Sequence, residues 1–131
     1  EDLEAVLILE DDFQLIHSER ETRQRWWRFL DTVPHFEIVS WAHNCLHPWG
    51  NSGSGHVRVW YLQTASAYVV RRSAMNRLRD IYLQALSERR PFDKVMTRIR
   101  EDVQWYAMMP ALSRQRQCFS DILHKRVDYG C

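Results

Sequence analysis

Three consecutive carboxylates, Glu10, Asp11 and Asp12, directly follow an apolar run and are the first candidates for chemistry in this chain. Residues 5–9 read AVLIL, a continuous aliphatic run typical of a strand that is buried on both faces. Adjacent acids repel one another unless a cation or hydrogen-bond donors compensate their charge. The pattern fits either a carboxylate cluster that binds a metal or a solvated turn that leads into the next element.

The composition indicates one ordered domain. A chain of 131 residues can bury roughly two-thirds of its unfolded surface, and its apolar content of 45% argues against disorder. The formal net charge of +1 provides no global field that would attract nucleic acid or an anionic membrane. No stretch approaches the ~20 apolar residues of a membrane-spanning helix.

The cysteines and the start of the chain bear on where the protein works. Cys45, Cys118 and Cys131 form no CxxC pair and provide no disulfide framework, which favours a reducing compartment. No signal peptide is present, so we expect a cytoplasmic location. The chain begins with Glu1 and reaches a strand within five residues, so we expect it to be a piece of a longer protein.

The elements that must position the acids are short strands and helices. Ser18 and Glu21 match a capping box and predict a helix that ends near Asp31. The apolar face of this helix would contain Trp26, Trp27, Phe29 and Leu30. Further strands are predicted over residues 35–42, 57–63, 66–72 and 103–109, and further helices from Ser73 to about Arg89 and from Asp93 to about Asp102. The tail, residues 111–131, reads as loop with some helix.

This mixture indicates an α/β domain. In open α/β sheets, ligands bind beyond the carboxyl ends of the strands, which is where the three acids lie.

Two other patterns have more ordinary explanations. His43, Cys45 and His47 are residue types that bind zinc, but a structural zinc site needs four ligands, so residues 43–55 are interpreted as a mobile loop. Trp41, beside this loop, fits the core, whereas Trp49 fits either the core or a surface that stacks a sugar ring. The basic and aromatic residues of 20–28 segregate onto opposite helix faces, which favours an amphipathic helix over a nucleic-acid contact.

A strand that ends in LEDD also occurs in response-regulator receiver domains, but the later features of those domains are missing. The region about 45 residues after Asp12 contains no Asp, and no Lys-Pro pair occurs in the chain. We therefore exclude a receiver domain.

Four blocks in order resemble family 25 glycosyltransferases. They are ILEDDF at 8–13, QTASAYVVRRSAMNRL at 63–78, PFD at 91–93 and PALSRQRQCFSDI at 110–122. The resemblance extends over most of the chain and corresponds to the later part of the family. It implies a GT-A-like mixed sheet flanked by helices, forming one partial domain over residues 1–131. The first portion of the family, with early strands and much of the nucleotide pocket, would precede Glu1.

The resemblance also implies an activity and its partners. The family transfers sugars, often galactose, from a nucleotide diphosphate sugar to a glycan or protein acceptor. Such transfer leaves a diphosphate, whose growing charge a divalent metal neutralises. Because carboxylate oxygens suit hard cations, we expect Mn²⁺ or Mg²⁺. The resemblance further implies a UDP-sugar donor and inversion at the sugar carbon.

The residues that match the family's motifs receive expected roles. Asp12 is the principal metal ligand, Glu10 and His124 are further metal ligands, and Asp11 reaches the metal or the ribose. Asp93 is the general base for the acceptor hydroxyl, or simply the N-cap of a helix. The expected substrate-binding residues, besides Asp11, are Gln63, Thr64, Ser66, Gln115, Ser120 and Asp121. Tyr68 is expected in the core.

Two other functions stay open at this point. One is a catalytically inactive sugar-binding or interaction domain derived from the same fold. The other is a metal-dependent phosphoryl-transfer enzyme that uses the same acidic triplet.

Overall fold

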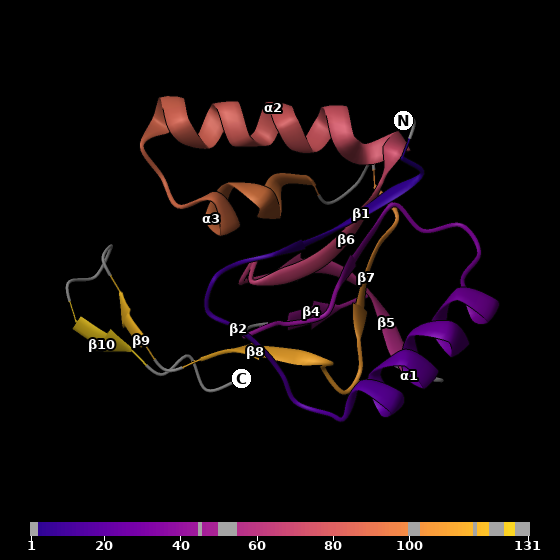
Figure 1. Cartoon of the computed structure of the whole chain (residues 1–131). Helices are drawn as coiled ribbons and strands as arrows, with labels where there is room; N and C mark the ends of the chain where they lie inside the picture. The colour runs from indigo at the N-terminus through magenta and orange to yellow at the C-terminus, as the bar shows by residue number, and fades with distance from the viewer. Residues whose placement is uncertain are drawn as a thin grey trace.

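The computed structural model describes residues 3–44, 46–49, 55–99 and 103–116, together with the backbone of Cys118–Ser120 and Lys125–Val127. Figure 1 shows the order of the elements along the chain. The helices are α1 (Glu19–Thr32), α2 (Arg72–Glu88) and α3 (Phe92–Met96), followed by a 3₁₀ turn over Thr97–Ile99. The strands are β1 (Ala5–Leu9), β2 (Phe13–Leu15), β3 (Ile38–Ser40), β4 (Leu46–Pro48), β5 (His56–Leu62), β6 (Ala67–Arg71), β7 (Trp105–Met108), β8 (Ser113–Gln115), β9 (Cys118–Ser120) and β10 (Lys125–Val127).

A six-stranded mixed sheet forms the centre of the fold, with the order β1-β6-β3-β7-β5-β4. β3 and β7 run parallel, whereas the other neighbours pair antiparallel. Two further pairs of strands, β2 with β8 and β9 with β10, form separate two-stranded sheets. The predicted α/β class with a mixed sheet is therefore confirmed.

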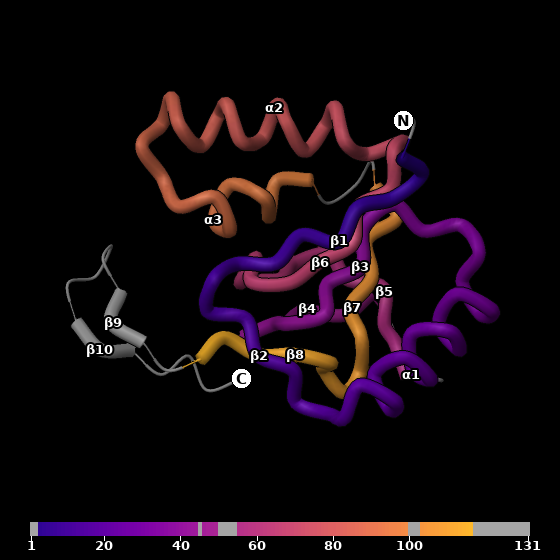
Figure 2. Tube along the Cα trace, in the orientation of Figure 1, coloured from indigo at the N-terminus to yellow at the C-terminus, as the bar shows by residue number. Residues whose placement is uncertain are grey.

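Both faces of the sheet carry an apolar core. On one face, α2 and α3 pack Leu78, Ile81 and Met96 against sheet residues such as Trp105. On the other face, α1 packs Phe29 against β3 and β6, and the β2–β8 ribbon adds to this side. Figure 2 shows α2 and α3 on one side of the strands and α1 on the other. Since β3 and β6 lie between both cores, their side chains are almost all buried.

Helix α1 forms as its sequence predicts. Ser18 caps it by accepting a hydrogen bond from the Glu21 backbone N–H at 3.3 Å. The helix ends at Thr32, one residue from the predicted end. The predicted apolar face is wrong at Trp27, whose side chain is 59% exposed. Successive residues on a helix point about 100° apart, so Trp26 and Trp27 cannot both face the sheet.

Two predicted helix starts are wrong. Helix α2 begins at Arg72, and its N-cap is Arg71 without a side-chain cap bond, so Ser73 lies inside the first turn. Helix α3 has Pro91 as its N-cap, so Asp93 is not the cap but lies in the first turn. The α-helical part ends at Met96, earlier than the predicted limit near residue 102. Helix α2 follows directly from β6 and helix α3 follows Pro91, and neither helix has a side-chain cap.

The expectation that residues 5–9 are buried on both faces is wrong. β1 is an edge strand, and its side chains alternate between exposed and half-buried. An aliphatic run indicates that the strand has apolar side chains, but it does not indicate whether the strand lies at the edge or in the centre of the sheet. The tail also differs from its prediction, because residues 113–115 form β8. No helix within the described residues is long and apolar enough to cross a membrane.

Candidate functional site

The acidic triplet forms a tight turn between β1 and β2. The Glu10 backbone N–H donates to the Ser66 carbonyl at 2.9 Å, and the Phe13 N–H donates to the Glu10 carbonyl at 3.2 Å. The Arg116 N–H donates to the Asp12 carbonyl at 2.7 Å. The turn is therefore fixed by the start of β6 on one side and by the end of β8 on the other. The acidic turn and the start of α3 both lie on the left side of Figure 1.

Gln115 connects three of the predicted blocks. Its amide nitrogen donates to Asp12 Oδ2 at 3.2 Å, and its amide oxygen accepts from Thr64 Oγ1 at 2.7 Å. The Asn44 amide lies 3.5 Å from the same oxygen. The Gln115 amide supplies a donor to the Asp12 carboxylate and an acceptor to the Thr64 hydroxyl, so one side chain makes both bonds. The bridge brings together residues that are up to 103 positions apart.

Thr64 holds a backbone conformation that is rare for its type. Its φ is 85°, and a β-branched residue in this region is strained. Such strain costs on the order of 1–3 kcal/mol and persists only where surrounding contacts enforce it. Thr64 is buried and bonded to Gln115, which provides such a contact. Nothing in the sequence pattern indicates this backbone geometry.

Ser66 is the second buried hydroxyl at this edge. Its side chain is 0% exposed, and its Oγ makes no hydrogen bond to the part of the chain that the structure describes. Buried hydroxyls normally find partners, so an unpartnered one beside the acidic turn marks a place where a polar ligand atom or a water would be stabilised.

The carboxylates crowd one another. The pKa of Glu10 is raised from 4.5 to about 6, mainly because burial disfavours its charged form, and further because Asp12, Asp93 and Asp11 repel that charge. Asp93 therefore lies within electrostatic range of the turn, although 81 positions separate it from Asp12 in the sequence. Glu10 is nevertheless exposed at the surface, so solvent screens part of this effect.

Asp93 itself is half-buried, and its Oδ1 accepts from the Lys94 N–H at 2.8 Å. This bond uses one carboxylate oxygen and fixes the orientation of the group on α3.

Tyr68 and Tyr82 form a hydrogen-bonded pair near the acidic turn. Tyr68 is 1% exposed, which confirms its predicted place in the core, and its hydroxyl lies 3.0 Å from that of Tyr82. The pKa of Tyr68 is raised, first by burial, then by Tyr82, and to a lesser extent by the charge of Glu10. Tyr82 in turn stacks on Phe92 with 3.7 Å between ring centroids. These contacts link the start of α3 to the site, and sequence reasoning did not identify Tyr82 or Asn44.

The donor set fits a hard cation in type. Mg²⁺ and Mn²⁺ usually take one or two protein carboxylates and complete their shell with water and phosphate. The described residues contain no group of three His, Cys, Asp or Glu side chains arranged to hold a metal.

For the other predicted residues, the structure describes no side-chain contact with this site. Gln63 turns its amide to the Tyr61 hydroxyl. Asp121, His124 and the side chain of Ser120 lie outside the described residues.

The predicted loop at residues 43–55 contains a short strand, β4, so its description as a loop is wrong there. His43 lies against the Met108 carbonyl at 3.2 Å, whereas His47 contacts Trp60 and Tyr61, and Cys45 lies outside the described residues. Trp41 is buried, as predicted. Trp49 is 57% exposed, with the Arg58 guanidinium 5.6 Å from its ring centroid.

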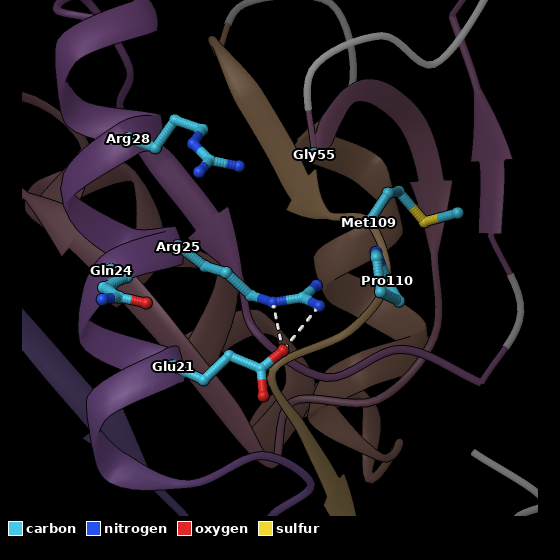
Figure 3. A pocket seen from close by; sticks show the side chains of 7 residues that line it. All are labelled: Glu21, Gln24, Arg25, Arg28, Gly55, Met109 and Pro110. Carbon is cyan, nitrogen blue, oxygen red and sulfur yellow. Dashed lines mark hydrogen bonds and ion pairs between the residues drawn. The ribbon is translucent and has the colours of Figure 1, made fainter.

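A separate hollow of about 410 Å³ lies between α1 and the chain that follows β7 (Figure 3). Arg25 donates from two nitrogens to one oxygen of Glu21, at 3.1 Å and 2.8 Å, and Arg28 extends toward the same space. None of the predicted site residues that the structure describes lines it. This hollow is cationic, so it is distinct in chemistry from the acidic turn.

Comparisons with protein-family models, with curated proteins and with solved structures found no match.

Proposed function

We propose that this domain is the metal-binding and acceptor-binding part of a glycosyltransferase of the GT-A type. Its donor would be a nucleotide diphosphate sugar, with UDP-galactose the first choice. One observation carries the proposal: Gln115 bridges Asp12 and Thr64, so three of the four blocks that resemble family 25 meet at the end of β1. The blocks were matched to the family by their order along the sequence, and residues from three of them are in contact in the fold.

The acidic turn would hold the donor diphosphate. Asp12 and Glu10 would bind Mn²⁺ or Mg²⁺, and the ion would neutralise the charge that develops on the leaving diphosphate. Asp11, which follows the strand and is exposed, is available for the ribose or the metal. The Thr64 hydroxyl, whose proton goes to Gln115, would accept a hydrogen bond from a sugar hydroxyl, and the Ser66 hydroxyl would donate to a phosphate or sugar oxygen.

Asp93 is the proposed general base. The acceptor oxygen would form a bond to the anomeric carbon while the bond from that carbon to the diphosphate oxygen breaks. The acceptor proton passes to the Asp93 carboxylate, and UDP leaves, so the configuration inverts. Asp93 suits this role because it lies close enough to Glu10 to raise its pKa and yet is positioned by a different element, α3.

A non-catalytic sugar-binding domain is the second candidate. One observation favours it: Asp12 Oδ2 accepts a hydrogen bond from the Gln115 amide. If Asp12 bound a metal through this oxygen, the hydrogen bond would be broken or weakened. Metal-dependent phosphoryl transfer has no observation of its own in its favour.

The first experiment is a calorimetric titration of Mn²⁺ into the chain, with and without UDP. The proposal expects UDP to tighten Mn²⁺ binding in the natural chain and expects Asp12→Ala to abolish that effect. Asp31→Ala is the matched control, because Asp31 is an exposed acid at the end of α1. If UDP tightens Mn²⁺ binding equally in Asp12→Ala and Asp31→Ala, the acidic turn does not hold the metal.

Activity assays then separate the candidates. Slow, Mn²⁺-dependent release of UDP from UDP-galactose, lost in Asp93→Asn and Asp12→Ala, is expected of a transferase with water as a poor acceptor. A domain that only binds sugar would release no UDP, and a phosphoryl-transfer enzyme would hydrolyse a simple phosphoester such as p-nitrophenyl phosphate.

A further inference from the structure

Strand β1 has an open side along the backbone. Glu10 and Glu4 bond to β6 through Ser66 and Arg72, both at 2.9 Å, so the even-numbered residues of β1 face β6. In an antiparallel pair the alternate residues point their N–H and C=O groups the other way. The backbones of Ala5, Leu7 and Leu9 therefore face away from β6, and β1 has no neighbour on that side within the described residues.

The β6 residues opposite these three confirm the alternation. Ala67, opposite Leu9, accepts from the Trp41 N–H at 2.9 Å, and Arg71, opposite Ala5, donates to the Glu37 carbonyl at 2.8 Å. Both bonds are directed to the β3 side of β6. The open backbone groups of β1 are thus a regular feature of the ladder and not a local distortion.

The side chains of β1 are apolar on both faces of the sheet. Leu7 and Leu9 are 42% and 46% exposed, and Leu3, just before the strand, is 57% exposed. On the opposite face, Val6 and Ile8 line an apolar hollow of about 410 Å³ that α2 completes with Met75 and Tyr82. A chain placed along this edge would therefore bury apolar surface above and below the sheet.

The other edge of the same sheet is protected, and β1 is not. β4 is short, contains Pro48 and the exposed His47, and shifts register between them. Natural sheets protect their edges by such means, because an open edge pairs with other chains. β1 consists of alanine, valine, leucine and isoleucine alone. This contrast indicates that β1 is built to be covered.

The charges around β1 define what covers it. Glu10, Asp11 and Asp12 follow the strand, so its carboxyl end is acidic, whereas at the other end Ala5 lies opposite Arg71 and Glu4 lies opposite Arg72. In a second copy paired antiparallel about Leu7, Glu4 would lie opposite Glu10, and like charges directly opposite one another destabilise a sheet. A strand with basic residues beside the acidic turn avoids this repulsion and meets Glu10, Asp11 and Asp12 with opposite charge.

We propose that β1 is a docking edge for an apolar polypeptide strand flanked by lysine or arginine, which extends the sheet beside β1. The partner strand pairs with the backbones of Ala5, Leu7 and Leu9. Its side chains cover Leu7 and Leu9 on one face and the hollow lined by Val6 and Ile8 on the other. This mode of binding draws affinity from the main chain and selectivity from the alternating pockets.

The test uses the chain with a synthetic peptide, KKVTIVVKK, and a control peptide, EEVTIVVEE, with the same core. Binding is measured by fluorescence anisotropy and by amide hydrogen exchange. We expect the basic peptide to bind and to slow exchange at the Leu7 and Leu9 amides, while the Val6 and Ile8 amides, already bonded to β6, change little. The acidic peptide is expected to bind roughly ten-fold more weakly or not at all.

A matched pair of variants checks the location. Leu7→Lys removes an exposed leucine and adds a positive charge at the edge, so binding should weaken roughly ten-fold. Leu83→Lys makes the same change at a leucine of α2 that is 58% exposed, and binding should be unaltered. Circular dichroism confirms that both variants fold.

Three results would overturn the proposal. The first is equal binding of the two peptides, and the second is equal binding by the two variants. The third is protection of the Leu7 amide by raised protein concentration alone, which would assign this edge to a second copy of the chain.

Discussion

Removing the charge of Glu10 should stabilise the metal-free protein. The pKa of Glu10 is raised from 4.5 to about 6, so the folded state binds a proton more tightly than the unfolded state. A difference of about 1.5 units corresponds to about 2 kcal/mol. Because solvent reaches part of Glu10, we discount this to about 1 kcal/mol.

The sign of the effect follows from linkage. Below pH 4.5 the carboxyl is protonated in both states and costs nothing. Between pH 4.5 and 6 the unfolded state loses its proton first, so stability falls as pH rises. Above pH 6 the cost is complete. Glu10→Gln should therefore be about 1 kcal/mol more stable than the natural chain at pH 7.5, and the difference should disappear near pH 4.

Urea unfolding followed by tryptophan fluorescence, in EDTA and at half-unit steps from pH 4 to 8, measures this difference. Glu88→Gln is a control of opposite sign, because Arg98, Gln84 and Arg90 lower the pKa of Glu88. That variant should lose stability at neutral pH. A Glu10→Gln variant that is equally or less stable at pH 7.5 would refute the crowding of carboxylates at the turn.

Three further substitutions test the contacts of the site and the core. Gln115→Leu leaves the Thr64 hydroxyl and the Asp12 carboxylate without the amide between them, so unfolding should become about 1–3 kcal/mol easier; an unchanged urea midpoint contradicts the bridge. Thr64→Gly relieves the strain of a φ of 85° but loses the hydroxyl, so stability should change by less than about 1 kcal/mol while Mn²⁺-dependent UDP binding weakens; intact binding contradicts a role for this hydroxyl. Trp105→Phe removes an indole N–H that donates to Ser40 Oγ at 3.0 Å in the core, and thermal unfolding should show a loss of about 1–3 kcal/mol; a loss below about 0.5 kcal/mol contradicts the importance of this bond.

Local sequence signals predicted the elements that depend on local physics. The capping box at Ser18 gave the start of α1 correctly, since the cap and its partner lie within one turn. The strands β5, β6 and β7 follow from short runs of β-branched and aromatic residues. The start of α2 was misplaced because Arg71 leads directly from β6 into the helix, so the Ser73 hydroxyl is not needed as a cap.

The arrangement of the site could be predicted only in part. The resemblance selected Asp12, Thr64 and Gln115, and the structure joins these three through hydrogen bonds. It did not select Asn44, whose contact with Gln115 depends on how β3 and β8 are placed in space. The edge position of β1 was missed for a similar reason: a neighbouring strand contributes nothing to the local pattern of AVLIL.

The bridge made by Gln115 also determines when the site can form. Asp12 and Gln115 are 103 positions apart, and closing so long a segment is entropically costly until β1, β6, β3 and β7 have already assembled. During synthesis the acidic turn emerges before its amide partner. The carboxylates therefore remain without this partner until residue 115 has been made, and the bridge forms only after the strands that carry it have come together.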